Sequence, residues 1–135
     1  MLFRNLANQN VNVPFIIKLL KQLRLPVTTS EFDIQYEIKR ILDQNNVEYE
    51  KEKVLAPRNR VDFFIYTGDN TGIIIEVKKG KPNRNLVIDQ LERYAQFESV
   101  LAVILVCDNR VKVPEKINGK TCVSIGLNRL WGVSL

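Results

Sequence analysis

Residues 60–79 constrain the fold most strongly, because they place charged groups inside two strand-forming runs. Residues 61–66 are β-branched or aromatic apart from Asp62, residues 68–72 form a glycine-containing turn cluster, and residues 73–77 contain three consecutive isoleucines before Glu76. Two such runs around a turn predict a β-hairpin. The uninterrupted isoleucines indicate that the second strand is central in its sheet, with both faces covered.

The charges of this hairpin are predicted to meet. Side chains alternate along a strand, so Glu76 and Lys78 point to the same face. If Tyr66 pairs with Gly72 across the turn, Asp62 lies directly opposite Glu76, about 5 Å away at Cβ. Carboxylates that close repel each other unless a cation lies between them, and hard oxygen ligands suit Mg²⁺. The hairpin therefore predicts a metal site beside a lysine.

The ordinary interpretation is different. An acidic residue two positions before a lysine usually marks a solvent-exposed strand with a weak ion pair. The matching register of Asp62 and the buried-strand pattern favour a functional site instead. The chain contains no histidine, which excludes Ser-His-Asp and Cys-His catalysis, and its two cysteines cannot complete a tetrahedral zinc shell. Carboxylates, lysines, amides and a bound ion remain.

Composition indicates one domain of the globular class. The chain has 135 residues, 45% of them hydrophobic, and a net charge of +5 with a pI near 9.3, which is compatible with a polyanionic partner. Cys107 and Cys122 lie in apolar runs and are interpreted as buried and structural. There is no span of membrane length and no signal-peptide pattern, so we expect a cytoplasmic protein without a membrane partner.

The flanking segments predict helices and further strands. Residues 14–25 form an amphipathic helix, which packs on the core or serves as a dimer contact or nucleic-acid arm. A capping box at residues 30–33 begins a helix that extends to about residue 45, and residues 47–55 form a charged edge strand. Residues 85–99 form another helix, and residues 101–107 a strand parallel to the isoleucine strand. The apolar stripe of this helix is expected to consist of Val87, Ile88, Leu91, Tyr94 and Ala95. Residues 121–127 add a strand, and residues 128–135, with Trp131, an apolar closing segment.

Several residues on these elements have two interpretations. Glu31 and Glu37 both lie close enough to the apolar stripe of their helix to reach inward, although Glu31 also suits the positive end of the helix dipole. Gln90 is either a surface residue or a site residue. The basic loop that follows Lys78 is either solvated or contacts phosphate.

The predicted elements follow one another as a helix, three strands, a helix and a strand, and this order resembles that of the PD-(D/E)XK nuclease superfamily. The residues of this chain that carry the resemblance are Glu31, Asp62, Glu76, Lys78 and Gln90. The spacing at the head of the first helix is similar to that of VRR-type nuclease domains and favours Glu31 over Glu37, and the small size is similar to that of Holliday-junction resolvases. Val61 stands where the family has its proline, a position that supplies no ligand.

The resemblance implies a single-domain α/β fold with a restriction-endonuclease-like αβββαβ core and a mixed central sheet flanked by helices. It covers residues 30–107 as the core, with residues 1–29 as an N-terminal helical extension and residues 108–135 as a C-terminal strand and closing segment. It does not account for these two flanking parts.

The resemblance also implies a function, Mg²⁺- or Mn²⁺-dependent hydrolysis of phosphodiester bonds in DNA, with RNA and a homodimer left open. Selection would follow backbone or structure instead of base sequence. Asp62, Glu76 and the Val77 carbonyl would bind the ion, and Glu31 would hold a water or a second ion. Lys78 would orient or deprotonate the attacking water, and Gln90 would position water or the strand. Nucleic-acid contacts are expected from Lys79, Lys81, Arg84, Arg60 and Arg93.

Two alternatives of another class remain. One is a nuclease fold that binds nucleic acid without cutting it, against which the intact set of acids and lysine argues. The other is a protein-interaction module with a structural ion, which only the leucine-rich N-terminal helix supports.

Overall fold

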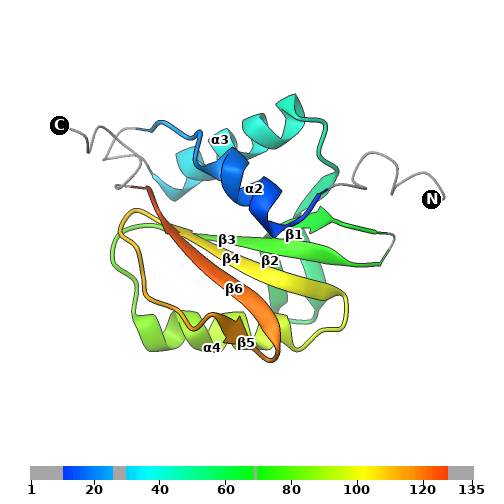
Figure 1. Ribbon diagram of the computed structural model, residues 1–135. Helices are drawn as coiled ribbons and strands as arrows, with labels where there is room; N and C mark the ends of the chain where they lie inside the picture. Colours follow the sequence, from blue (N-terminus) through cyan, green and yellow to red (C-terminus); the bar gives the residue numbers. More distant parts are fainter. Residues whose placement is uncertain (1–10, 26–29, 69, 128–135) are drawn as a thin grey trace.

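The computed structural model describes residues 11–25, 30–68 and 70–127 of the chain. Within them the chain forms an α/β structure of three helices and one six-stranded sheet (Figure 1). The elements, in chain order, are α2 (Val13–Leu20), α3 (Glu31–Gln44), β1 (Tyr49–Ala56), β2 (Asn59–Tyr66), β3 (Gly72–Lys78), α4 (Arg84–Ala95), β4 (Val100–Cys107), β5 (Lys116–Ile117) and β6 (Lys120–Gly126).

The sheet is mixed and has the order β1-β2-β3-β4-β6-β5. β1, β2 and β3 pair antiparallel, β3, β4 and β6 pair parallel, and β5 returns antiparallel to β6. The predicted hairpin register is confirmed, because Tyr66 pairs with Gly72 and Phe63 with Ile75. The predicted parallel pairing of β4 with β3 is also confirmed. β3 is therefore an interior strand, buried from Gly72 to Val77.

Helices cover both faces of the sheet, which gives three layers. In Figure 1 α2 and α3 lie above the sheet and α4 below it. The alternation of β3 divides its side chains between the two cores: Ile73, Ile75 and Val77 pack with α2 and α3, whereas Ile74 packs with α4. The same alternation turns Glu76 and Lys78 toward α4.

Two predicted helices end earlier than expected. α2 ends at Leu20 instead of residue 25, because the N–H groups of Gln22 and Leu23 bond back three residues, as in a turn, which still buries Leu23. α4 ends at Ala95 instead of residue 99, where the Phe97 N–H bonds to the Tyr94 carbonyl. Ile88, expected in the apolar stripe of this helix, is only half-buried.

Other local predictions are confirmed. The Ser30 side chain accepts from the Asp33 N–H while the Asp33 carboxylate accepts from the Ser30 N–H, which is the predicted capping box of α3. β1 is an edge strand and β6 forms as expected. The predicted closing segment with Trp131 lies outside the described residues. No helix in the described part of the chain is long and apolar enough to cross a membrane.

Candidate active site

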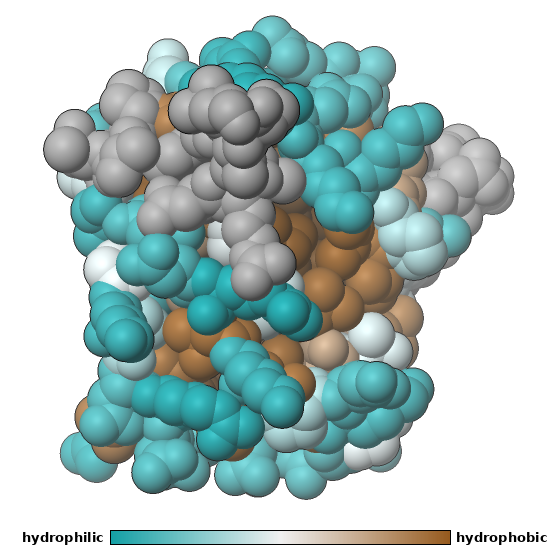
Figure 2. All heavy atoms as spheres, turned by 60° about the vertical axis from the view of Figure 1, so that its left-hand side comes forward, coloured by the Kyte–Doolittle hydropathy of each residue, from teal (hydrophilic) through white to brown (hydrophobic). Residues whose placement is uncertain are grey.

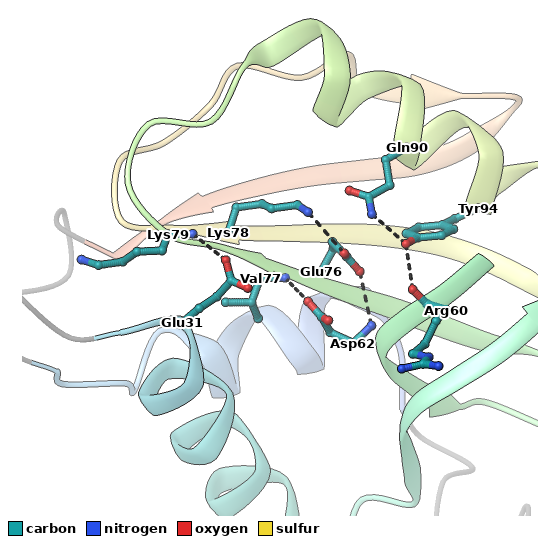
Figure 3. Close-up of polar contacts among 9 residues, drawn as sticks. All are labelled: Glu31, Arg60, Asp62, Glu76, Val77, Lys78, Lys79, Gln90 and Tyr94. Carbon is teal, nitrogen blue, oxygen red and sulfur yellow. Dashed lines mark hydrogen bonds and ion pairs between the residues drawn. The ribbon is translucent and has the colours of Figure 1, made fainter. Parts of the chain in front are cut away.

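Asp62 and Glu76 interlock at the point where the β2–β3 ladder stops. The last backbone pair is Phe63 with Ile75. One position further, the Val77 N–H donates to Asp62 Oδ2 at 2.8 Å and the Asp62 N–H donates to Glu76 Oε1 at 3.3 Å (Figure 3). Each carboxylate thus binds the strand that carries the other. The two acids thus lie at neighbouring positions of β2 and β3, where their side chains replace the backbone bonds that a regular ladder would make. That they share one ion stays a prediction.

This arrangement raises the pKa of both acids. Burial and then the charge of Asp62 raise the pKa of Glu76 to about 8, against the opposing effect of Lys78. Burial also raises the pKa of Asp62, which the Val77 N–H opposes and the charge of Glu31 reinforces. Glu76 is only 4% exposed. Two carboxylates held together in a largely dry place are stable as anions only with added positive charge.

Glu31, and not Glu37, is the helix acid that reaches this region. Glu31 Oε2 accepts from the Lys79 N–H at 3.0 Å, directly after β3, whereas Glu37 pairs with Arg40 on its own helix at 2.8 Å. The N-terminal position of Glu31 on α3 is what brings it to the end of β3. The residue pattern left this choice open, and the packing of α3 on the sheet decides it.

Lys78 and Gln90 lie on the α4 side of the same site. Lys78 Nζ is 3.7 Å from Glu76 Oε2, and Gln90 Nε2 donates to the Tyr94 hydroxyl at 2.9 Å. That hydroxyl in turn donates to the Arg60 carbonyl at 2.8 Å. Figure 3 shows both Lys78 and Gln90 in the space between β3 and α4. Gln90 lines the same cavity as Lys78, and its role as a site residue stays a prediction.

Tyr94 was expected only as a core residue of α4. It is buried, yet its hydroxyl joins Gln90 to β2, and burial followed by the charge of Glu76 raises its pKa to about 12. A buried tyrosine needs a partner for its hydroxyl. Tyr94 lies four residues after Gln90, which is one helical turn. The need of its hydroxyl for a partner is therefore the signal in the sequence that could have linked Tyr94 to Gln90.

The basic residues expected to contact nucleic acid do not form one cluster. Lys81 is exposed in the β3–α4 loop, and Arg84 Nε donates to the Lys112 carbonyl at 2.7 Å. Arg60 Nη1 lies 3.6 Å from Glu52 Oε1. Arg93 lines a separate hollow between α4 and the β5–β6 turn.

Lys79 has a different setting from its neighbours. Its ammonium pairs with Asp108 Oδ2, which also accepts from the Gly80 N–H at 3.3 Å. Asp108 is 5% exposed and directly follows β4. The sequence interpretation missed this acid, although ligand-binding residues often follow the carboxyl ends of parallel strands.

The donor set suits a hard divalent cation. Asp62, Glu76 and Glu31 supply carboxylate oxygens, and the Val77 carbonyl points to the same side of β3 as its N–H, toward Asp62. Among the described residues, however, no three acidic or cysteine side chains are placed so that they could hold one ion. The Asp62, Glu76 and Glu31 carboxylates each accept a backbone N–H. The chemistry of the donors fits Mg²⁺ or Mn²⁺.

Comparison with protein-family models, curated proteins and solved structures finds no match to this chain.

Proposed function

We propose that this chain is a Mg²⁺- or Mn²⁺-dependent nuclease that hydrolyses phosphodiester bonds in DNA, with a core of PD-(D/E)XK type. The observation that carries the proposal is the interlocked pair of Asp62 and Glu76 with the Lys78 ammonium 3.7 Å from Glu76. A purely structural role would not require the buried Glu76 carboxylate beside the half-buried Asp62 carboxylate, because their repulsion destabilises the fold.

Asp62, Glu76, Glu31 and the Val77 carbonyl are the groups that would hold the ion. When bound, a divalent ion lowers the pKa of a coordinated water and neutralises charge on the scissile phosphate. The raised pKa of Glu76 fits this role, since the added positive charge favours its ionised form.

The remaining groups position the reactants. Lys78 carries three N–H donors on the same strand face as Glu76, so it can hold a phosphate oxygen or orient the attacking water. The Tyr94 hydroxyl holds Gln90 in place, and its amide can orient water or the substrate strand. Lys81 and Arg84 offer charge to backbone phosphates. Contacts of this kind select backbone and structure instead of base sequence.

The deciding experiment is cleavage of linear, flapped and four-way-junction DNA, and of RNA, with Mg²⁺, Mn²⁺ or EDTA. We expect cleavage that requires the ion and is lost in Asp62→Asn. Asp89→Asn, which makes the same change on the exposed side of α4, is the control and should cut normally. An inactive wild type that still binds DNA would make the chain a non-catalytic binding subunit.

Metal binding has a separate readout that needs no substrate. Because the ion relieves the repulsion between the carboxylates, Mg²⁺ or Mn²⁺ should raise the Tm of the wild type, and the increase should grow with the logarithm of ion concentration above the Kd. Asp62→Asn should abolish this increase and Asp89→Asn should keep it. Equal increases in both variants would place the ion elsewhere.

A further inference from the structure

A cavity of about 190 Å³ lies between the end of β3 and the first turns of α4. Its lining residues are Lys78, Pro82, Asn83, Leu86, Val87 and Gln90. Lys78 also contacts Glu76 at 3.7 Å, so the cavity adjoins the candidate active site. Figure 3 shows two of these lining residues, Lys78 on β3 and Gln90 on α4.

The lining is not that of a phosphate site. Pro82, Leu86 and Val87 make it largely apolar, and the Asn83 side chain already accepts from the Leu86 N–H at 3.1 Å. Leu86 is 67% exposed. Figure 2, which brings forward the side of the molecule where β3 and β4 end, shows hydrophobic surface framed by hydrophilic side chains.

The surroundings of the cavity are basic. Lys78 forms part of its wall, and the exposed Lys81 and Arg84 lie on either side of Pro82 and Asn83 in the chain. An apolar recess next to positive charge complements a nucleotide, which joins a flat apolar base to an anionic phosphate. Sites that enclose a whole drug-sized ligand have about 300–1,000 Å³, so this smaller cavity has room for one base only.

We infer that the cavity binds the base of the nucleotide next to the scissile phosphate, and that the substrate must carry an unpaired nucleotide at this position. The inference rests on the proposed function. A paired base is stacked and hydrogen-bonded inside the duplex and cannot enter a side pocket unless it is first unpaired. A flap, bulge, frayed end or single strand presents the base without that cost.

The test compares three duplexes of one sequence: one fully paired, one with a single unpaired thymine in its centre, and one with an abasic unit in place of that thymine. Affinity is measured in EDTA, so that cleavage does not interfere. We expect the wild type to bind the thymine duplex roughly tenfold more tightly than the other two, because the cavity buries apolar surface of the base at about 25 cal/mol per Å².

Leu86→Ala removes the exposed apolar wall without disturbing the core. It should reduce the preference for the thymine duplex to about twofold and leave binding of the abasic duplex unchanged. The reason is that the Leu86→Ala substitution and the removal of the base delete the same contact. The matched control is Leu101→Ala, a second exposed leucine at the opposite end of β4. This control should keep the full preference.

The outcomes separate the inference from the proposed function. Equal affinity for thymine and abasic duplexes, or an equal loss on both in Leu86→Ala, overturns the inference. Cleavage of all three duplexes at one rate with Mg²⁺ also overturns it while supporting the nuclease. A base preference that depends on Leu86, without any cleavage, supports binding of an unpaired base in the cavity and contradicts the nuclease. Failure to bind any of the three duplexes contradicts both.

Discussion

At the scale of single residues, the interlocked acids and their lysine perform different tasks. Asp62 accepts a backbone N–H from β3 and Glu76 accepts one from β2, so these proposed metal ligands also stabilise the end of the hairpin. Lys78 is only partly buried and lies 3.7 Å from Glu76. Its removal should therefore affect chemistry far more than folding.

Lys78→Met is expected to leave folding and metal binding largely intact and to reduce the cleavage rate by about 10²- to 10⁴-fold, as for loss of an acid-base or positioning group. Single-turnover cleavage at saturating enzyme measures this, because it reports chemistry apart from binding. Lys39→Met is the control, since Lys39 forms a comparable pair with Asp43 on the exposed face of α3. A wild-type rate in Lys78→Met would contradict the role.

Glu76 should make the stability of the metal-free protein depend on pH. Its folded pKa of about 8 lies above the ordinary value of 4.5, so between these values the folded state holds a proton that the unfolded chain has lost. The free energy of unfolding therefore falls as pH rises from about 4.5 to about 8, by at most about 1.4 kcal/mol per pH unit for this group.

Urea unfolding at pH 5 to 8.5 in EDTA measures this slope. Glu76→Gln cannot titrate and should flatten it, whereas Glu37→Gln, which removes an acid outside the site, should keep it. The raised pKa of Asp62 acts in the same direction, so some slope should remain in Glu76→Gln at the acid end. If Glu76→Gln and the wild type have the same slope above pH 6, Glu76 is already ionised in the folded protein.

At the scale of elements, the β3–α4 loop is fastened to two other parts of the fold. Glu31 of α3 accepts from the Lys79 N–H, and Asp108, after β4, binds both the Lys79 ammonium and the Gly80 N–H. Gly80 has φ +74, a conformation that suits glycine. The loop that lines the cavity and carries Lys81 is thus held in one place by acids from α3 and from the end of β4.

Asp108→Asn keeps the shape of this acid and removes its charge. We expect a loss of about 1–3 kcal/mol in the free energy of unfolding, typical of a charged hydrogen-bond partner, together with faster hydrogen exchange at the amides of Lys79 and Gly80. Denaturant unfolding and exchange mass spectrometry measure the two effects, with Asp89→Asn as the control. Unchanged exchange would mean that the loop is held without Asp108.

At the scale of the whole molecule, the two layers of helices leave open the edge where β3 and β4 end, and the proposed site lies there. The acids, Lys78 and the basic loop meet there, and Arg84 ties this loop to the segment after β4 through the Lys112 carbonyl. Lys79 pairs with Asp108, which leaves Lys81 and Arg84 as the best placed of the expected phosphate contacts.

Replacing both Lys81 and Arg84 with Ala should weaken DNA binding and reduce the slope of log affinity against log salt by about 2, since each phosphate contact contributes about 0.9. Affinities between 50 and 200 mM salt measure this. The double variant Lys39→Ala, Arg40→Ala makes the same change in charge on the outer face of α3 and should not alter the slope. If the two double variants have equal slopes, the β3–α4 loop is an ordinary solvated turn without phosphate contacts.

Much of the fold was predictable from the sequence because it depends on neighbours in the chain. Alternation determined the faces of β3, the turn length determined the pairing of Tyr66 with Gly72, and Ser30 with Asp33 marked the start of α3. The same register brought Asp62 and Glu76 together before any tertiary contact was considered.

Tertiary packing decided what lies between elements. Only the docking of α3 on the sheet shows that Glu31 reaches β3 while Glu37 bonds within its helix. Only the pairing of β4 with β3 brings Asp108 to Lys79, and only the seating of α4 joins Tyr94 to β2 and forms the cavity beside Lys78. Periodicity determines which face of an element is apolar, but the partner of each side chain at its border depends on how distant segments pack.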